Sequence, residues 1–511
     1  AMRIGVIEIL KASPSRGLPQ RLYCETIIKQ YASVMPQAVS AWCRELGHDV
    51  FYATYYGQQD PRSLLPHDLD LVFVATYTQA SALAYALARR FRAEGTTTVI
   101  GGHHARSFPE DCARFFDVVV VECDRTLIRE IVSDPPHGQI VSSGRVLQEL
   151  PGVEERMPEI RAAFFFDGRP RATSTVPLLA STGCPYTCDF CIDARSRYSV
   201  MPLDRVEADL RFLRGHYPKL AVTFHDPNFA IRFDEVLSVM ERVARGRRYY
   251  AIESSLSILK NTSRLERLRD SGCLYIAPGV ESFGNYADKS GLRAIHSARE
   301  RLEAVAAQLQ TINDYIPGIQ ANYIFGLDTD AGDEPVELLK EIMTRTPFVW
   351  SVVNIPMPFG GTPLYDRMLA GGRILEAMPF HFYYKPYLPL RLAHYDPIAY
   401  YRGLIEIWGH VVSPALTARR LVKTPGSIRI LHGMRTYHAF RLLRACQEIL
   451  RLLETDRAFR AFHEGDTEVL PDYYRRTMQR ELGDYASLLT DDDLRPVRAV
   501  ALPEAQGGSG H

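Results

Sequence analysis

The segment from Thr175 to Cys191 reads TVPLLASTGCPYTCDFC, and the rest of the chain can be interpreted outward from it. Its first part is a short β-branched and apolar run, which predicts a buried parallel strand. Its second part places Cys184, Cys188 and Cys191 in a C-x3-C-x2-C pattern directly after that strand. We therefore expect three thiols on a loop at the carboxyl end of a strand, where barrel enzymes carry out chemistry.

This cysteine triplet indicates a metal or redox site rather than a disulfide. Thiolates select iron–sulfur clusters, zinc or copper(I). Zinc sites usually take four ligands in paired spacings, and no fourth Cys or His follows here at a suitable spacing. Three thiolates on a 4Fe–4S cluster leave one iron open, so we favour that cluster; a zinc site remains the alternative. The other cysteines are scattered along the chain: Cys24, Cys43, Cys112, Cys123, Cys273 and Cys446.

Strands and helices alternate on both sides of the triplet. Five strands alternate with helices before residue 134, which predicts a doubly wound parallel sheet. From residue 175 onward six βα-type units predict an open, partial (β/α)6 barrel, and the chain after it is helical. We expect an α/β protein divided into a first sheet domain, an irregular linker, a barrel and a helical region, at 1–134, 135–174, 175–385 and 386–511.

Composition narrows the classes of function. The 511 residues are 46% hydrophobic and 23% charged, and Lys plus Arg balance Asp plus Glu at 60 each. A neutral chain gives no support for general nucleic-acid or anionic-membrane binding. No apolar run reaches the roughly 18–20 residues of a membrane span, and the first residues lack a signal-peptide pattern. We expect a cytoplasmic protein, in a compartment where thiols stay reduced.

The triplet and four later segments, in order, resemble the radical S-adenosylmethionine (SAM) superfamily. Gly183 precedes the first cysteine and Phe190 precedes the last. The later segments follow successive predicted strands, and the resemblance covers roughly residues 175 to 365. They are His225-Asp-Pro-Asn-Phe229, Gly279-Val-Glu-Ser282, Asn322-Tyr-Ile-Phe-Gly-Leu-Asp328 and Pro356-Met-Pro-Phe-Gly-Gly-Thr-Pro-Leu-Tyr365.

The resemblance implies that Cys184, Cys188 and Cys191 hold the cluster and that its open iron chelates SAM. It places a second group of residues along SAM: Phe190, Asp226, Asn228, Gly279, Glu281 and Ser282. Taken singly, Asp226 or Glu281 also fits an ordinary loop carboxylate. The catalytic residues beyond the cofactor sites stay unknown.

The first domain resembles the cobalamin-binding domains found in part of this superfamily. The stretch Gly101-Gly102-His103-His104-Ala105 followed by Phe108-Pro109-Glu110 is similar to their GGPHA…PEE stretch. The residues that the resemblance places along cobalamin are Thr76, Tyr77, Thr78, Gly101 and Gly102. The loop from Ile9 to Val34 contains no histidine, which excludes histidine ligation of cobalt from this loop. We interpret His103 and His104 as loop residues rather than cobalt ligands. The long loop Lys11–Pro36 either covers a cofactor or is a surface excursion.

The favoured function is a cobalamin-dependent radical SAM enzyme that takes hydrogen from an unreactive carbon and then transfers a methyl group from methylcobalamin. A radical rearrangement or cyclisation, with or without cobalamin, is the alternative within enzymes; a zinc-stabilised binding or scaffold protein is the alternative outside them. The implied partners are a small-molecule or peptide substrate and an electron donor such as flavodoxin or ferredoxin. The aromatic and basic stretch His381–Tyr387 fits either domain packing or a flat or anionic substrate.

Overall fold

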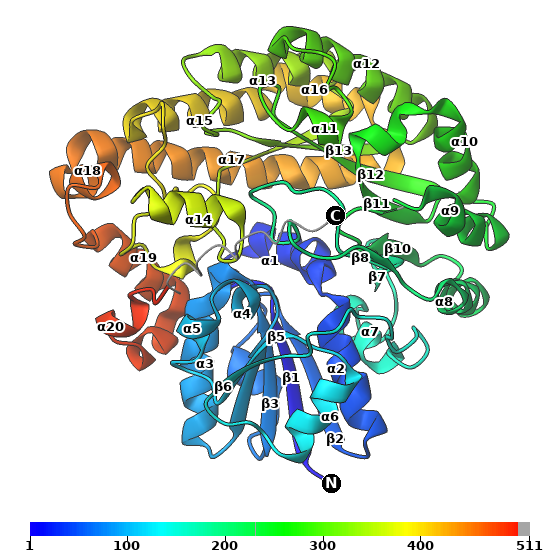
Figure 1. The fold of residues 1–511 in the computed structure, drawn as a ribbon, viewed down its shortest axis with the longest axis vertical. Helices are drawn as coiled ribbons and strands as arrows, with labels where there is room; N and C mark the ends of the chain where they lie inside the picture. The colour runs from blue at the N-terminus through cyan, green and yellow to red at the C-terminus, as the bar shows by residue number, and fades with distance from the viewer. Residues whose placement is uncertain (230, 499–511) are drawn as a thin grey trace, which may run out of the picture.

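The computed structural model describes residues 1–229 and 231–498. It contains two parallel sheets, stacked one above the other with helices around them (Figure 1). The α/β fold predicted from the sequence, a parallel sheet followed by a partial barrel and C-terminal helices, is confirmed. The predicted C-terminal region extends to residue 511, and its last part, 499–511, lies outside the described residues.

The first sheet has six parallel strands in the order β2-β1-β3-β4-β5-β6. Their bounds are β1 Arg3–Ile9, β2 Asp49–Tyr55, β3 Leu71–Thr76, β4 Thr97–Gly101, β5 Val118–Glu122 and β6 Gln139–Ser142. The helices of this part are α1 Leu18–Thr26, α2 Val34–Glu45, α3 Ser81–Ala93, α4 His103–Ser107, α5 Pro109–Cys112 and α6 Arg125–Ser133. Strand order reverses between β1 and β3, which makes their carboxyl ends a switch point for ligand binding.

Apolar side chains cover both faces of this sheet. On one face Trp42 of α2 and Ile131 of α6 pack in the same cluster as Ile4 and Val6 of β1. On the other face Leu87 and Phe91 of α3 pack in a second cluster, with Ile7, Val72 and Ile100. Burial on both faces explains why these strands are almost continuously apolar in sequence.

The second sheet has six parallel strands in sequential order, as expected of an open partial barrel. Their bounds are β7 Thr175–Leu178, β10 Ala221–Phe224, β11 Tyr250–Ser255, β12 Cys273–Glu281, β13 Gly318–Ile324 and β14 Val349–Asn354. The helices between and after them are α8 Leu203–His216, α9 Phe233–Arg242, α10 Thr262–Ser271, α11 Ala287–Ser290, α12 Ala298–Tyr315, α13 Glu334–Arg345 and α14 Pro363–Ala370.

The C-terminal helices pack against the barrel and extend to the first domain. They are α15 Pro397–Val411, α16 Pro414–Lys423, α17 Gly426–Thr455, α18 Arg457–Glu464, α19 Asp472–Leu482 and α20 Asp491–Leu494. Helix α17 crosses the molecule above α1, and α1 lies between the two sheets (Figure 1). None of the helices in the described part of the chain has the length and apolar character that crossing a membrane requires.

Two segments differ from the sequence prediction. The region 135–174, expected to be an irregular linker, contributes β6 to the first sheet and contains helix α7 (Met157–Phe164). The region Lys11–Pro36, expected to be a long loop, contains α1 and a 3-10 turn at Ile28–Tyr31. Strand β6 is a short edge strand with mostly exposed residues, so its sequence carries little strand signal. The domain limits themselves remain a prediction.

Candidate functional site

The three cysteines lie on a loop that follows β7 and is closed at its base by a small antiparallel ribbon. That ribbon pairs β8 (Ser181–Thr182) with β9 (Ser199–Val200). Within the loop the Cys191 amide donates to the Cys188 carbonyl at 3.0 Å, and the Asp193 amide donates to Cys191 Sγ at 3.4 Å. The loop thus starts at the carboxyl end of a barrel strand, as the sequence predicted.

Gly183, just before the first cysteine, permits the close approach of the two sides of this loop. Its φ is +68°, a region that residues with a side chain seldom adopt. A Cβ atom built on it would lie 2.3 Å from the Arg197 carbonyl oxygen, far inside van der Waals contact. Both the backbone angle and the space therefore require glycine.

Asp226 fixes the base of the cysteine loop. Its carboxylate accepts hydrogen bonds from the Ala180 amide at 3.0 Å and from the Ser181 hydroxyl at 2.6 Å. Burial raises the pKa of Asp226 to about 7, against the effect of these donors. Asp226 therefore holds the strand end from which the loop departs, rather than pointing at the cysteines themselves.

Asn228, two residues later, connects a neighbouring strand to a cysteine. Its Oδ1 accepts from the Ser255 amide at 2.9 Å, at the end of β11. Its Nδ2 lies 3.8 Å from Cys184 Sγ. Of the two polar residues predicted in this turn, only Asn228 contacts a cysteine side chain.

Glu281 ends β12 in a strained conformation and pairs with a lysine that the sequence analysis missed. Its φ is +64°, and its Oε1 lies 2.6 Å from Lys289 Nζ, with both side chains largely buried. A Cβ on Gly279 would lie 2.3 Å from Glu281 Oε1, so Gly279 makes room for this pair. Ser282 closes the turn by accepting from the Gly284 amide at 3.0 Å.

Phe190, a residue of the cysteine loop, lies next to this ion pair. Its ring meets the Tyr286 ring edge-on at 5.2 Å, and Lys289 Nζ lies 5.8 Å from its centroid. Its neighbour Asp189 accepts hydrogen bonds from the Tyr286 hydroxyl and from Arg367. Asp189, Tyr286 and Lys289 were not predicted, because no spacing in the sequence connects the cysteine loop with the turn after β12.

The thiols are close enough to influence one another electrostatically. Burial raises the pKa of Cys188 to about 11; the positive charge of Lys289 opposes this rise, and the other two cysteines add to it. Among the described residues no three His, Cys, Asp or Glu side chains form a ready metal-binding group. The donor set, three soft thiols on one turn, fits an iron–sulfur cluster better than a tetrahedral zinc ion.

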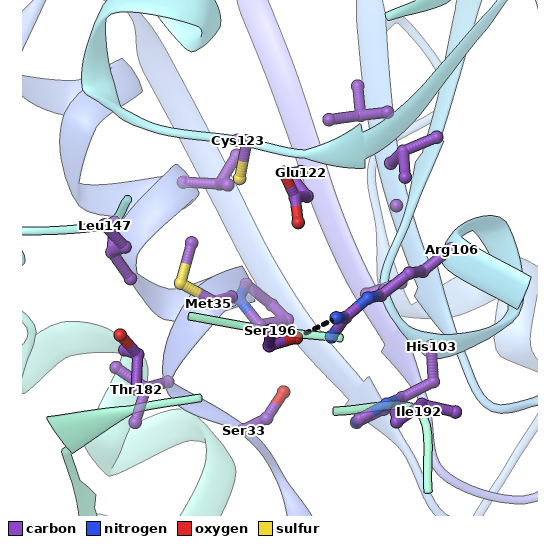
Figure 2. Close-up of a pocket in the computed structure, with 18 of the residues that line it drawn as sticks. Ser33, Met35, His103, Arg106, Glu122, Cys123, Leu147, Thr182, Ile192 and Ser196 are labelled. Atoms are coloured by element: carbon purple, nitrogen blue, oxygen red, sulfur yellow. Dashed lines mark hydrogen bonds between the residues drawn. The ribbon is translucent and has the colours of Figure 1, made fainter. Parts of the chain in front are cut away.

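A cavity of about 810 Å³ lies between the carboxyl ends of the first sheet and the cysteine loop (Figure 2). From the first sheet it is lined by the ends of β1, β3, β4 and β5; from the barrel it is lined by residues on both flanks of the cysteines, including Thr182, Gly183, Ile192 and Ser196. Arg106 of α4 crosses its edge, donating to Asp193 at 3.1 Å and to Ser196 at 2.5 Å.

Four of the five residues predicted along a large cofactor line this cavity: Thr76, Tyr77, Gly101 and Gly102. Thr78 does not line it; it is buried and its hydroxyl lies 3.3 Å from His104 Nδ1. Gly101 leaves its side open, because a Cβ there would meet only the Val120 carbonyl, at 3.8 Å. The space and the small residues fit a bulky planar ligand approaching the backbone.

The two histidines of the glycine loop have different places. His104 is fully buried and bonded to the Tyr85 hydroxyl at 2.6 Å, so it belongs to the packing of the first domain. His103 lines the cavity (Figure 2). Its ring stacks on the Tyr77 ring at a centroid distance of 5.2 Å. Burial lowers the pKa of His103. The uncharged form of this imidazole, which lines the cavity, is therefore favoured.

Comparisons with known proteins also indicate the radical SAM superfamily. A family model described as the radical SAM superfamily matches residues 178–342. A bacteriochlorophyllide d C-12(1)-methyltransferase of Chlorobaculum tepidum is 22% identical over 337 residues, covering 64% of this chain and 73% of that protein. A hopanoid C-2 methylase of Rhodopseudomonas palustris is 27% identical over 206 residues, 38% of each chain.

A solved structure also shares the fold. It is a radical S-adenosylmethionine methyltransferase, TsrM, from Kitasatospora setae, with cobalamin and a 4Fe–4S cluster bound. It aligns with a TM-score of 0.56 at 13% identity and covers 88% of this chain and 100% of that one.

Proposed function

Because the chain belongs to the radical SAM superfamily, we propose that it is a cobalamin-dependent radical SAM methyltransferase. The observation that carries this proposal is the shared wall between the two sites. The cavity at the carboxyl ends of the first sheet is closed on its other side by residues that flank the three cysteines. A large cofactor in that cavity would therefore lie next to the cysteine loop.

In this proposal Cys184, Cys188 and Cys191 hold a 4Fe–4S cluster. When bound, the cluster and SAM supply a 5′-deoxyadenosyl radical that takes hydrogen from an unreactive carbon, and methylcobalamin supplies the methyl group. SAM would lie along Phe190, Asn228, Gly279, Glu281 and Ser282. The corrinoid would lie along Thr76, Tyr77, Gly101 and Gly102, which line the cavity.

The chain's own residues orient these parts. Asp226 anchors the strand end from which the cysteine loop departs, and Asn228 bridges the loop to β11. Glu281 and Lys289 form a buried ion pair against Phe190, which keeps a fixed polar edge beside the cysteines. The strand ends contribute small and apolar residues to the cavity wall, such as Ala75 and Val99, beside charged ones such as Arg106 and Glu122.

The experiment that tests the proposal measures both cofactors on one preparation. Protein reconstituted anaerobically with iron and sulfide, after growth with hydroxocobalamin, should carry four irons and a corrinoid absorption band. Cys188→Ala should lose the iron and form no 5′-deoxyadenosine, while Cys446→Ala, a buried cysteine on α17, keeps both. Wild-type SAM cleavage by Cys188→Ala, or tightly held zinc in place of iron, contradicts the proposal.

A second variant separates the corrinoid from the cluster. Gly101→Leu should exclude the corrinoid because its side chain extends into the cavity, and it should leave the iron content unchanged. Gly215→Leu is the matched control, since Gly215 on α8 also has open space around it but lies away from the cavity. Corrinoid retained by Gly101→Leu would instead favour radical chemistry without cobalamin.

The remaining parts of the proposal concern the surroundings of the enzyme. We propose a small-molecule substrate, in keeping with the tryptophan bound in a second TsrM structure. We also propose that a flavodoxin or ferredoxin in the cytoplasm supplies the electron, since the cluster needs a one-electron donor and the thiols need a reducing compartment.

A further inference from the structure

The stretch of chain at residues 407–447 contains no acidic residue. It carries six arginines and one lysine, whereas the whole chain has 60 acidic and 60 basic side chains. Most of it forms α16 and the first part of α17, which are joined at Thr424 and Pro425; residues 414–447 are called the basic helix pair below. A local excess of positive charge in a chain without net charge indicates a surface for an anionic partner.

Five of these seven cations are exposed, and none of the five forms an ion pair with a residue that the structure describes. They are Arg419, Lys423, Arg429, Arg441 and Arg444. The other two are used inside the protein: Arg420 is buried and donates to the Val411 carbonyl at 3.1 Å, and Arg435 donates to the Tyr275 hydroxyl. The exposed cations therefore have no partner that packing of the chain provides.

Two large aliphatic side chains lie beside the turn that joins the two helices. Val422 is 77% exposed, the most of any large apolar side chain among the described residues, and Ile430 is 67% exposed. Each is next to a cation in the sequence, Lys423 and Arg429. The Arg429 Nε donates to the Thr424 carbonyl at 3.0 Å, which holds this cation against the turn. The turn thus presents aliphatic and positively charged groups together.

The exposed face of α17 continues this combination of apolar and basic side chains. Ile430, Tyr437, Arg441 and Arg444 follow one another at intervals of 7, 4 and 3 residues, so they share one face of the helix. Phe440 is also exposed, and the Arg444 guanidinium lies 4.8 Å from its ring centroid. Acidic residues return only at Glu448, beyond this part of the helix.

The basic helix pair lies at the amino ends of the barrel strands, away from the cysteine loop. A Cβ on Gly318, the first residue of β13, would lie 2.9 Å from Ile428 of α17. The Arg420 guanidinium of α16 lies 4.9 Å from the ring of Trp350, near the start of β14. The cysteine loop follows the carboxyl end of β7, and all strands of this sheet are parallel. The two features are therefore at opposite ends of the barrel.

This combination separates three kinds of anionic partner. An acidic protein that reduces the cluster must approach the cysteine loop, at the other end of the barrel. A nucleic acid binds through cations and gains little from exposed aliphatic side chains such as Val422 and Ile430. An anionic bilayer uses all three kinds of side chain, because aliphatic groups enter the acyl boundary, aromatic rings lie at the headgroups and cations pair with phosphates.

We propose that the basic helix pair docks on the surface of an anionic phospholipid bilayer. Val422 and Ile430 enter the headgroup region, and the five exposed cations pair with lipid phosphates. The chain lies on the bilayer in this arrangement, since none of the described helices has the length and apolar character to cross one. Docking uses no residue of either cofactor site, so it holds independently of the proposed function.

The test measures binding of the full-length, cluster-reconstituted protein to lipid vesicles by anaerobic sedimentation. One set contains phosphatidylglycerol and phosphatidylcholine in equal parts, and the other contains phosphatidylcholine alone. Binding to the anionic set should be at least about tenfold tighter, and salt at about 0.5 M should weaken it at least about fivefold. No binding to the anionic set, or equal binding to both sets, overturns the inference.

Two double variants separate the contributions of charge and apolar surface. Arg419→Gln with Lys423→Gln, and Val422→Ser with Ile430→Ser, should each weaken binding to the anionic vesicles about tenfold or more. All four side chains are exposed, so thermal unfolding should be unchanged in both variants. Wild-type binding by either double variant contradicts the proposed surface.

Matched controls lie elsewhere on the molecule. Arg211→Gln with Arg214→Gln removes two exposed cations from α8, where Glu207 pairs with Arg211. Val469→Ser removes an aliphatic side chain that is 69% exposed, next to Glu468. Both controls should bind the anionic vesicles as the wild type does. A loss in the controls as large as in the double variants would show that no single surface is responsible.

Two further measurements distinguish a bilayer from other anionic partners. Tryptophan fluorescence of Val422→Trp should shift to shorter wavelength on anionic vesicles relative to the wild type, and that of Val469→Trp should not. A uridine oligonucleotide of about 20 nucleotides should not displace the protein from the vesicles. Displacement by the oligonucleotide, or an unshifted Val422→Trp spectrum, would identify a general polyanion surface and overturn the inference.

Discussion

Gly183 is the residue of the cysteine loop that tolerates no side chain. Gly183→Ala places a Cβ at a φ of +68° and 2.3 Å from the Arg197 carbonyl. The backbone angle alone costs about 1–2 kcal/mol, and the overlap must in addition displace the loop. We expect Gly183→Ala to take up less than about half of the iron of the wild type on reconstitution, measured by iron analysis and the cluster absorption band.

Gly138→Ala is the matched control for this prediction. Gly138 has a similar φ of +74°, but a Cβ there would meet no atom within 4 Å. It should lose about 1 kcal/mol of stability and keep its iron. Equal iron uptake by the two variants would show that the contact with Arg197 does not shape the cysteine loop.

Glu8 makes the stability of the protein depend on pH, and the direction of that dependence follows from the shift in its pKa. It is 3% exposed at the floor of the cavity, and burial raises its pKa from 4.5 to about 7, against hydrogen bonds from Ser33. The folded state therefore binds this proton more tightly than the unfolded state. The resulting stability is complete below the unfolded pKa and is lost as pH rises toward and through 7.

Glu8→Gln should remove this dependence, because the amide stays neutral and its oxygen still accepts from the Ser33 amide. Between mildly acidic and mildly alkaline pH, the wild type should lose up to about 3 kcal/mol more stability than the variant. Urea unfolding at both pH values measures the difference. Parallel pH curves for the two proteins would contradict the assignment.

Single residues were predictable where a motif is local. The three cysteines, Gly183 and the cavity-lining Gly101 and Gly102 lie in short patterns directly after strands. Lys289 and Asp189 were not predictable, because their partners come from other strands and meet only in the folded barrel. Thr78 was assigned with its neighbours, yet the backbone turns there and directs it to His104.

Elements were predictable where periodicity is strong. The buried strands of both sheets follow from their apolar runs, since parallel strands are covered on both faces. Helix α1 carries Pro, Arg and Gln among few apolar residues, so its own sequence favours a loop. Packing against α17 stabilises it as a helix. The contact joins Tyr23, Cys24 and Ile27 to Leu431 and Met434. No local sequence pattern predicts this contact.

A buried aromatic contact joins a segment of the first domain to a segment that follows the barrel. Phe108, which follows α4, stacks on Phe380 at 3.8 Å, and both rings are buried. Phe108→Ala should destabilise the protein by about 3–5 kcal/mol and speed proteolysis between the sheets, measured by thermal unfolding and limited trypsin digestion. Phe440→Ala, which truncates a ring that is 43% exposed on α17, should change stability by less than about 0.5 kcal/mol. Similar losses in both variants would show that the Phe108 contact does not hold the sheets together.

In the proposed function, the molecule as a whole places two cofactor sites next to one another, separated by residues that flank the cysteines. Neither half forms the cavity alone: the first sheet supplies the strand ends, and the barrel supplies the residues that flank the cysteines. The sequence predicted each half separately, because each has its own motif. The distance between the halves depends on packing between segments far apart in the chain, so it could not be predicted.

Substitution of Arg106 tests whether the first domain helps to hold the cysteine loop in place. From α4, Arg106 donates a hydrogen bond to Ser196 of the cysteine loop (Figure 2). It also pairs with Asp193, and the two side chains are 31% and 19% exposed. A partly exposed ion pair contributes about 1 kcal/mol, so Arg106→Gln should release iron to a chelator about fivefold faster under anaerobic conditions. The same variant should hold the corrinoid less tightly, because Arg106 also lines the cavity.

Arg125→Gln, which breaks only exposed ion pairs with Glu45 and Glu149, should match the wild type in both measurements. Unchanged iron release in Arg106→Gln would mean that the cysteine loop is fixed by the barrel alone, and that the first domain positions its ligand without constraining the cluster.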